Sequence, residues 1–130
     1  MKATVSFAVF AVAILSGADV AIAQDSAAGK VAFAKCQVCH AVGVGATNKI
    51  GPELNGLDGR ATETAAGYQY SAALKNAGFT WDQANFTAFM QNPRTKVPNN
   101  KMAFAGMKDP SEIANLWAYL SQFKADGSPK

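Results

Sequence analysis

The sequence predicts an all-α domain with a few helices joined by long loops, and three observations lead to this prediction. No segment after residue 23 shows the sustained apolar–polar alternation that is typical of half-buried strands. Residues 109–120 carry the strongest helix signal in the chain. Five glycines and Pro52 fall within residues 43–59, which therefore form a loop.

Residues 1–23 are expected to be a cleaved signal peptide and residues 24–130 a single domain. Lys2 gives a positive start, an apolar run follows, and residues 21–23 have the small-x-small form of a cleavage site. An uncleaved membrane anchor is the alternative. The apolar run is shorter than the roughly 20 residues that a spanning helix needs, and Asp19 would lie in lipid.

Three helices are predicted before residue 93. Alanine-rich residues 26–35 form the first, which leads into a cysteine pair, and residues 71–76 form a short second helix that stops before Gly78. Residues 80–83 form a capping box, with Thr80 as the N-cap of a third helix that ends near residue 92. That helix should bury Phe86, Phe89 and Met90.

The last helix has the clearest boundaries. Asp109 is the expected N-cap, Pro110 takes the first helical position, and Glu112 completes the box by reaching back to the cap. The apolar positions then follow at i, i+3, i+4 and i+7: Ile113, Leu116, Trp117 and Leu120. No helix or strand is expected between residues 93 and 109, and loops this long are usually functional.

The charge pattern argues against nucleic-acid binding. The formal net charge is +3, from 12 basic and 9 acidic residues, and removal of residues 1–23 leaves it unchanged. A mildly basic surface of this kind suits acidic protein partners. Neither an arginine-rich run nor a series of stacking aromatics is present.

The chemistry is concentrated in Cys36-Gln37-Val38-Cys39-His40, which contains both cysteines and the only histidine. Cys-x-x-Cys-His is the attachment signature of haem c. Two thiols about one helical turn apart can add to two vinyl groups of the porphyrin, and the neighbouring imidazole can bind the iron. Cys36 and Cys39 are therefore predicted to hold one covalent haem, and His40 to ligate its iron.

Three other interpretations of this motif compete. A thioredoxin-like redox pair requires a preceding strand and a βαβ pattern, which the glycine-rich loop does not provide. A structural zinc site needs four ligands, and only carboxylates remain after these three residues. A plain disulfide leaves the adjoining His40 unexplained.

The second axial ligand cannot be another histidine. The soft candidates after residue 23 are Met90, Met102 and Met107. Met90 shares a helical face with Phe86 and is more simply a core residue. Met102 lies in the middle of the long connection, so the spacing favours it over Met107.

Around this motif the sequence resembles class I cytochromes c of the mitochondrial-like type found in bacterial periplasms. The matching segments cover nearly all of residues 24–130 in the right order. They are Gly29 and Phe33, the 36–40 motif, Gly51-Pro52-x-Leu54-x-Gly56-Leu57-x-Gly59-Arg60, Gly67-Tyr68-x-Tyr70-Ser71, Gly78-x-Thr80-Trp81, Asn92-Pro93, Pro98-x-x-Lys101-Met102-x-Phe104-x-Gly106 and Ala118-Tyr119-Leu120.

The resemblance implies the class I cytochrome c fold, with three to five helices and long loops wrapped around one covalent haem. It implies that Met102 is the second axial ligand and that the Pro52 carbonyl accepts a hydrogen bond from His40. It also implies that Gly29 and Phe33 pack against the last helix.

The resemblance further implies that Tyr70 and Trp81 hydrogen-bond a haem propionate, with Arg60 close by to offset its charge. Three positions depart from the commonest pattern. Leu74 replaces an asparagine, Phe89 a tyrosine, and Asn100 a threonine. In many members of the family these polar groups hold a buried water near the methionine side of the haem.

The implied function is outer-sphere, one-electron transfer by a monomeric periplasmic carrier that is not an enzyme. Expected partners have acidic docking surfaces: a cytochrome bc-type complex, an oxidase, a reaction centre or a dehydrogenase. The resemblance places six lysines around the haem edge: Lys35, Lys49, Lys75, Lys96, Lys101 and Lys108. A five-coordinate haem enzyme or gas sensor, and a redox-inactive zinc-binding or structural module, are the competing classes.

Overall fold

A computed structural model describes residues 24–130, so the predicted signal segment, residues 1–23, lies outside the described residues. The helices are α1 (Ser26–Phe33), α2 (Ala72–Lys75), α3 (Gln83–Gln91), α4 (Pro93–Lys96) and α5 (Pro110–Ser121). Residues 24–130 contain no strand, and only two isolated β-bridges, Ala61 to Thr80 and Phe123 to Pro129, occur there. The all-α prediction is therefore confirmed, and no helix in this range is both long and apolar enough to cross a membrane.

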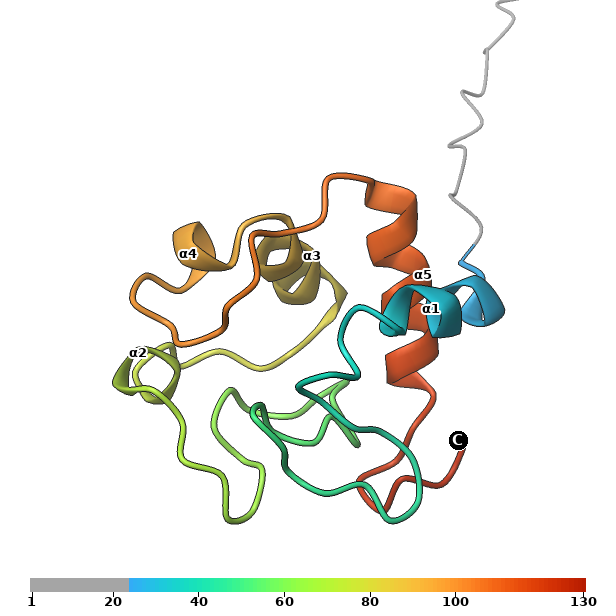
Figure 1. The fold of residues 1–130 in the computed structure, drawn as a ribbon, viewed down its shortest axis with the longest axis horizontal. Coiled ribbons are helices and arrows are strands. Elements are labelled where there is room, and N and C mark those ends of the chain that lie inside the picture. Colours follow the sequence, from blue (N-terminus) through green and yellow to red (C-terminus); the bar gives the residue numbers. More distant parts are fainter. Residues whose placement is uncertain (1–23) are drawn as a thin grey trace, which may run out of the picture.

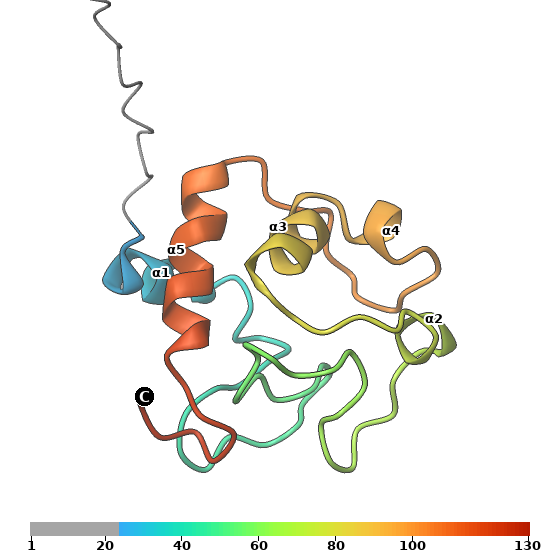
Figure 2. The same cartoon turned by 180° about the vertical axis from the view of Figure 1, so that it is seen from behind.

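Helices α1 and α5 cross at one end of the molecule, and the loops and smaller helices fill the other (Figures 1 and 2). The crossing is close because Gly29 has no side chain: a Cβ there would lie 1.9 Å from the Asn115 carbonyl oxygen. The Phe33 ring packs against Tyr119 with a centroid separation of 5.6 Å. The predicted contact of Gly29 and Phe33 with the last helix is confirmed.

Helix α5 begins as predicted. The Asp109 side chain accepts a hydrogen bond from the Ser111 amide, and the core-facing side chains of Ile113, Leu116 and Leu120 are at most 1% exposed. The predicted return of Glu112 to the cap is not what the structure shows. Glu112 instead pairs with Lys35, which ties α5 to the segment that follows α1.

The predicted N-cap of α3 was wrong by two residues. Asp82, not Thr80, accepts from the Asn85 amide at 2.7 Å. Thr80 is held in extended backbone by its bridge to Ala61 and is not available as a cap. Asp is at least as good an N-cap as Thr, so the local pattern allowed both starting points.

Helix α4 was missed, because residues 93–109 were predicted to contain no helix. It is a single turn in which the Asn92 side chain accepts from the Thr95 amide and Pro93 takes the first position. Asn followed by Pro is a start signal for a helix, so Asn92-Pro93 marks the start of α4 as well as the end of α3. This turn supports the loop that carries Met102.

Candidate haem site

The attachment motif continues the winding of α1 after the helix ends at Phe33. The Cys36 amide donates to the Phe33 carbonyl at 2.8 Å, and the His40 amide donates to the Cys36 carbonyl at 2.9 Å. These bonds fold the motif into one compact turn. Cys36 and Cys39 are partly buried free thiols, and burial raises the pKa of the Cys36 thiol.

The His40 ring is oriented by the backbone of the following loop. Its Nδ1 lies 2.7 Å from the Pro52 carbonyl oxygen, as the resemblance implies. A carbonyl can only accept, so Nδ1 carries the proton and Nε2 keeps its lone pair. Burial lowers the pKa of His40, the Pro52 bond opposes this, and the charges of Arg60 and Lys49 lower it further. The neutral imidazole that metal binding requires is therefore favoured.

Gly51 has a role at this site that sequence reasoning missed. A Cβ at this position would lie 2.4 Å from His40 Cε1 and 2.8 Å from both ring nitrogens. The ring therefore rests directly on the backbone of Gly51, next to its acceptor Pro52. A glycine directly before a proline in a loop was the available signal, because it marks backbone that another group can approach closely.

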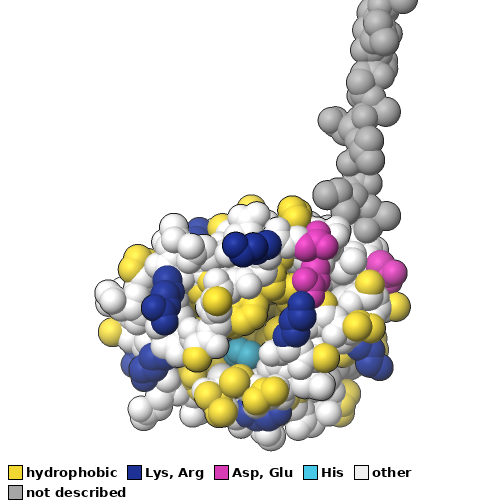
Figure 3. Space-filling view, turned by 45° about the horizontal axis from the view of Figure 1, so that its top comes forward, with side chains coloured by type: hydrophobic (Ala, Val, Ile, Leu, Met, Phe, Trp, Pro, Cys, Tyr) yellow, Lys and Arg dark blue, Asp and Glu magenta, His cyan; other side chains and the backbone are white. Residues whose placement is uncertain are grey.

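Met102 and Cys36 are far apart in the sequence but pack against the same hydrophobic core, which includes Leu57 and Trp81. Figure 3 shows a face of the molecule with a hollow whose floor is apolar; the only histidine lies in this hollow, and Lys and Arg side chains are spaced around it. The long loop thus carries a thioether to the core against which the attachment motif packs.

Arg60 is the centre of a polar cluster in the loops between α1 and α3. Its Nη1 donates to Glu53 Oε1 at 3.1 Å and to the Asn55 carbonyl at 2.8 Å, and its Nη2 donates to the Glu53 carbonyl at 2.7 Å. Its Nε is buried and has no partner among residues 24–130. A buried donor of this kind costs about 1–3 kcal/mol when it is left unpaired, and a hydrogen-bond acceptor such as a carboxylate would offset this cost.

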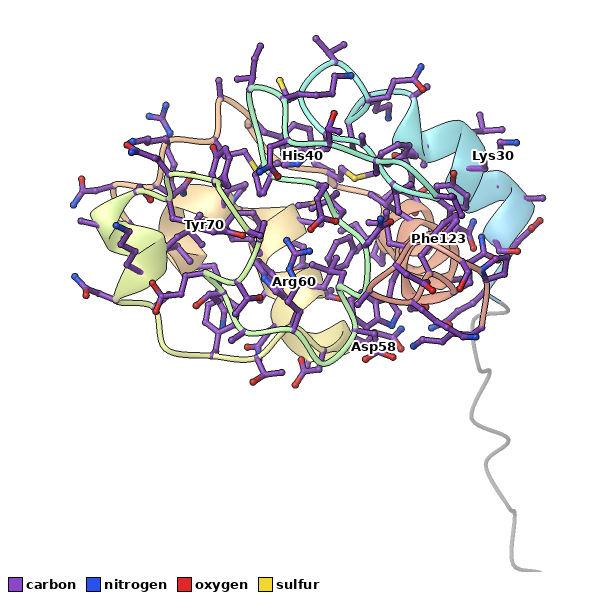
Figure 4. All side chains as sticks on the ribbon, turned by 90° about the horizontal axis from the view of Figure 1, so that it is seen from below. Lys30, His40, Asp58, Arg60, Tyr70 and Phe123 are labelled. Carbon is purple, nitrogen blue, oxygen red and sulfur yellow. The ribbon has the colours of Figure 1, made fainter. Side chains whose placement is uncertain are left out.

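Tyr70 adjoins this arginine. Its hydroxyl accepts from the Ala65 amide at 2.8 Å and lies 3.5 Å from Arg60 Nη2, so its own proton is free to donate. In Figure 4, His40, Arg60 and Tyr70 belong to the loops between α1 and α3, and Lys30 lies apart on α1.

Trp81 is joined to the same centre through the backbone, because its amide donates to the Arg60 carbonyl at 2.8 Å. The indole is 8% exposed and stands edge-on to Phe79 and Phe89, with centroid separations of 5.0 and 5.2 Å. No hydrogen bond of its N–H to another described residue is found. The side chains of Arg60 and Tyr70 are therefore in contact, Trp81 adjoins them through its backbone, and each of the three has a donor without a partner among the described residues.

These residues fit a covalently attached haem. Two free thiols and a neutral imidazole match the ring edge and the iron, an apolar floor matches the ring face, and the unpaired Arg60 Nε matches a propionate carboxylate. A structural zinc site fits less well. Within residues 24–130, no group of three or more His, Cys, Asp and Glu side chains could hold a metal ion.

The three positions that depart from the usual pattern have different surroundings. Leu74 is half-buried against the core, and Phe89 is 4% exposed beside Trp81. Both are apolar and cannot hold a water. Asn100 is polar, but its amide is used within the Met102 loop.

The six lysines expected around the haem edge divide into two groups. Three are held by the protein: Lys35 by Glu112, Lys49 by the Gln37 carbonyl, and Lys96 by Asn85 and the face of Phe79. The other three, Lys75, Lys101 and Lys108, are exposed and make no side-chain hydrogen bond or ion pair with another described residue.

Comparison with known proteins identifies the family. The cytochrome c family model matches residues 26–124. Cytochrome c2 of Rhodoplanes tepidamans is 57% identical over 107 residues, which cover 82% of this chain and 100% of that protein. Cytochrome c-550 of Bradyrhizobium diazoefficiens is 56% identical over 105 residues, 81% of this chain and 77% of that protein.

Among solved structures, cytochrome cH from Methylobacterium extorquens superposes with a TM-score of 0.69 at 45% identity. The match covers 74% of this chain and 96% of the other. The family-model match, residues 26–124, includes the attachment motif and the segments that surround it. The chain belongs to the cytochrome c family.

Proposed function

We propose that this protein is a periplasmic electron carrier, not an enzyme, in which His40 and Met102 are the axial ligands of the haem iron. As a member of its family the chain carries one covalently bound haem c and is a one-electron carrier. The haem, when bound, supplies the one-electron couple. The side chains of this chain hold the haem, orient its ligands and exclude water from it.

In this proposal Cys36 and Cys39 would hold the haem through two thioether bonds, each formed by addition of a thiol S–H across a vinyl double bond, so that nothing would leave. His40 offers Nε2 to the iron, with its orientation fixed through Nδ1 by Pro52. Arg60, Tyr70 and Trp81 donate to a propionate. The apolar core around Met102 keeps water from the metal, and a thioether ligand raises the reduction potential.

The observation that carries the proposal is the meeting of the attachment motif and the Met102 loop at one apolar core. The proposed carrier domain, residues 24–130, contains the whole of the family-model match, residues 26–124, and residues 1–23 are proposed to be a cleaved signal peptide. Export through such a signal would place the carrier in the periplasm.

Replacement of Met102 by leucine tests the ligation. Leucine has nearly the same volume but no sulfur, so packing is retained. The ferric absorption band assignable to an iron–thioether bond should disappear, and the reduction potential should fall by on the order of 0.1 V, within the span of about 0.8 V that axial ligands set. A visible spectrum and a redox titration measure both.

Met107→Leu is the matched control. Met107 was the second candidate in the same connection, but it is 5% exposed and lies within the core. That variant should keep the band. If the band instead survives in Met102→Leu and is lost in Met107→Leu, the assignment of the ligand is wrong.

Partners are proposed to be redox proteins with acidic docking surfaces, such as a cytochrome bc-type complex, an oxidase, a reaction centre or a dehydrogenase. The exposed Lys75, Lys101 and Lys108 favour encounter with such a surface. Oxidation of the reduced protein by an anionic one-electron oxidant should slow about tenfold between roughly 0.01 M and 0.5 M salt, because screening shortens the reach of surface charge. Stopped-flow absorbance measures this rate.

The opposite trend is expected with a cationic oxidant of similar size. Lys101→Gln should weaken the salt dependence more than Lys124→Gln. Lys101 is next to the proposed ligand Met102, whereas Lys124 is another exposed lysine in the C-terminal segment after α5. Equal rates at all salt concentrations with the anionic oxidant would refute electrostatic steering.

A further inference from the structure

We infer that the side chain of Asn100 is the residue that positions Met102, by fastening the backbone of the ligand loop to helix α4. Its Nδ2 donates to the Pro93 carbonyl at 2.9 Å and to the Val97 carbonyl at 2.8 Å. Its Oδ1 accepts from the Met102 amide at 2.9 Å. One amide thus uses both donors and its acceptor to join three backbone groups.

The two carbonyl groups that accept from the Asn100 side chain belong to buried residues. Pro93, the first residue of α4, is less than 2% exposed, and Val97, the C-cap that follows α4, is 3% exposed. Asn99, with φ +64°, turns the chain directly before Asn100. The amide therefore links the two buried residues that flank the exposed part of α4 to the residue that bears the thioether.

The far end of the loop is fastened separately. The Met107 amide donates to the Met90 carbonyl at 2.7 Å, and a Cβ on Gly106 would lie 2.4 Å from the Gln91 carbonyl oxygen. Between these ties, residues 101, 103 and 105 are exposed. The Met102 carbonyl accepts from the Phe104 amide at 3.0 Å, a bond within the loop, so the bond from Asn100 is the tie that joins Met102 to α4.

This inference rests on the proposed ligation by Met102. Loss of the tie gives the loop more open states, in which the thioether has left the iron and an external ligand can enter. The apparent affinity for such a ligand rises with the population of the open state. Threonine at position 100 has one hydroxyl and cannot join three backbone groups in this way.

The test is titration of the ferric haem-loaded protein with imidazole, followed by loss of the iron–thioether band. In Asn100→Ala the apparent Kd should fall about tenfold, equivalent to about 1.4 kcal/mol. Asn99→Gly is the matched control. It removes the neighbouring amide, for which no hydrogen bond within residues 24–130 is found, and it keeps the positive φ, so its Kd should equal that of the unmodified protein.

Several outcomes would overturn the inference. One is an unchanged Kd in Asn100→Ala; another is a shift in the denaturant midpoint alone, which indicates a merely structural role. A wild-type spectrum without the iron–thioether band would overturn the ligation proposal and this inference together. A changed band in Asn100→Ala with an intact wild-type band concerns Asn100 only and supports its role.

Amide hydrogen exchange of the unmodified haem-loaded protein gives a second test that does not depend on a variant folding. The Met102 amide should exchange more slowly than those of Ala103 and Ala105, which find no acceptor among the described residues. Exchange of all three at the same rate would show that the Asn100 bond does not hold the loop.

Discussion

Replacement of both Cys36 and Cys39 by serine is expected to abolish covalent haem and with it the folded carrier. A hydroxyl does not add to a vinyl group under conditions in which a thiol does, so no bond to the ring can form. The partly buried apolar side chains at the edge of the core, among them Met102, would then lack a large apolar ligand to pack against. A ligand that binds only the folded state stabilises it, and its loss removes that contribution.

The measurement is the mass of the protein and its absorbance after acid–acetone extraction, which removes haem that is not covalently bound. The double variant should be colourless and should unfold without a cooperative transition. Gln37→Ala combined with Val38→Ala is the control, because both intervening side chains are exposed and neither contributes a thiol. A coloured serine variant after extraction would contradict the attachment site.

Gly29→Ala is the second substitution with a large expected effect, a loss of about 3 kcal/mol in the free energy of unfolding. Alanine is favoured over glycine in a helix by about 1 kcal/mol, so local propensity alone predicts stabilisation. The new methyl group would lie 1.9 Å from the Asn115 carbonyl oxygen and 2.8 Å from Tyr119 Cβ. A backbone carbonyl within α5 cannot turn aside, so the two helices must separate.

Denaturant unfolding of the haem-loaded protein measures this loss. Val31→Ala is the matched control on the same helix, since Val31 is 75% exposed and its truncation should change stability by less than about 0.5 kcal/mol. An alanine variant at position 29 as stable as the unmodified protein would mean that the close approach of α1 and α5 is not required.

The parts of the fold that could be predicted are those specified by neighbouring residues. Asp109 and Pro110 set the start of α5 because a cap and the first turn involve only adjacent positions. The attachment motif could be identified for the same reason, since its thiols and imidazole fall within five consecutive residues. The resemblance supplied the distant partners, such as Pro52.

The parts that could not be predicted depend on contacts between distant segments. Thr80 does not cap α3 because it forms a bridge with Ala61, a contact that no local pattern reveals. Glu112 reached Lys35 rather than its own helix end. The position of Asn100 stood out only as a departure from a common pattern, and its three bonds required coordinates.

The pairing of the first and last helices also shapes how the chain assembles. The Asp25 amide donates to Asn115 Oδ1 across 90 positions, so this contact closes nearly the whole domain into a ring. Loop-closure entropy grows only logarithmically, and each doubling of length adds about 0.6 kcal/mol. Once the ring is closed, every intervening segment is tethered at both ends, so the methionine segment can detach and return while the two ends stay joined.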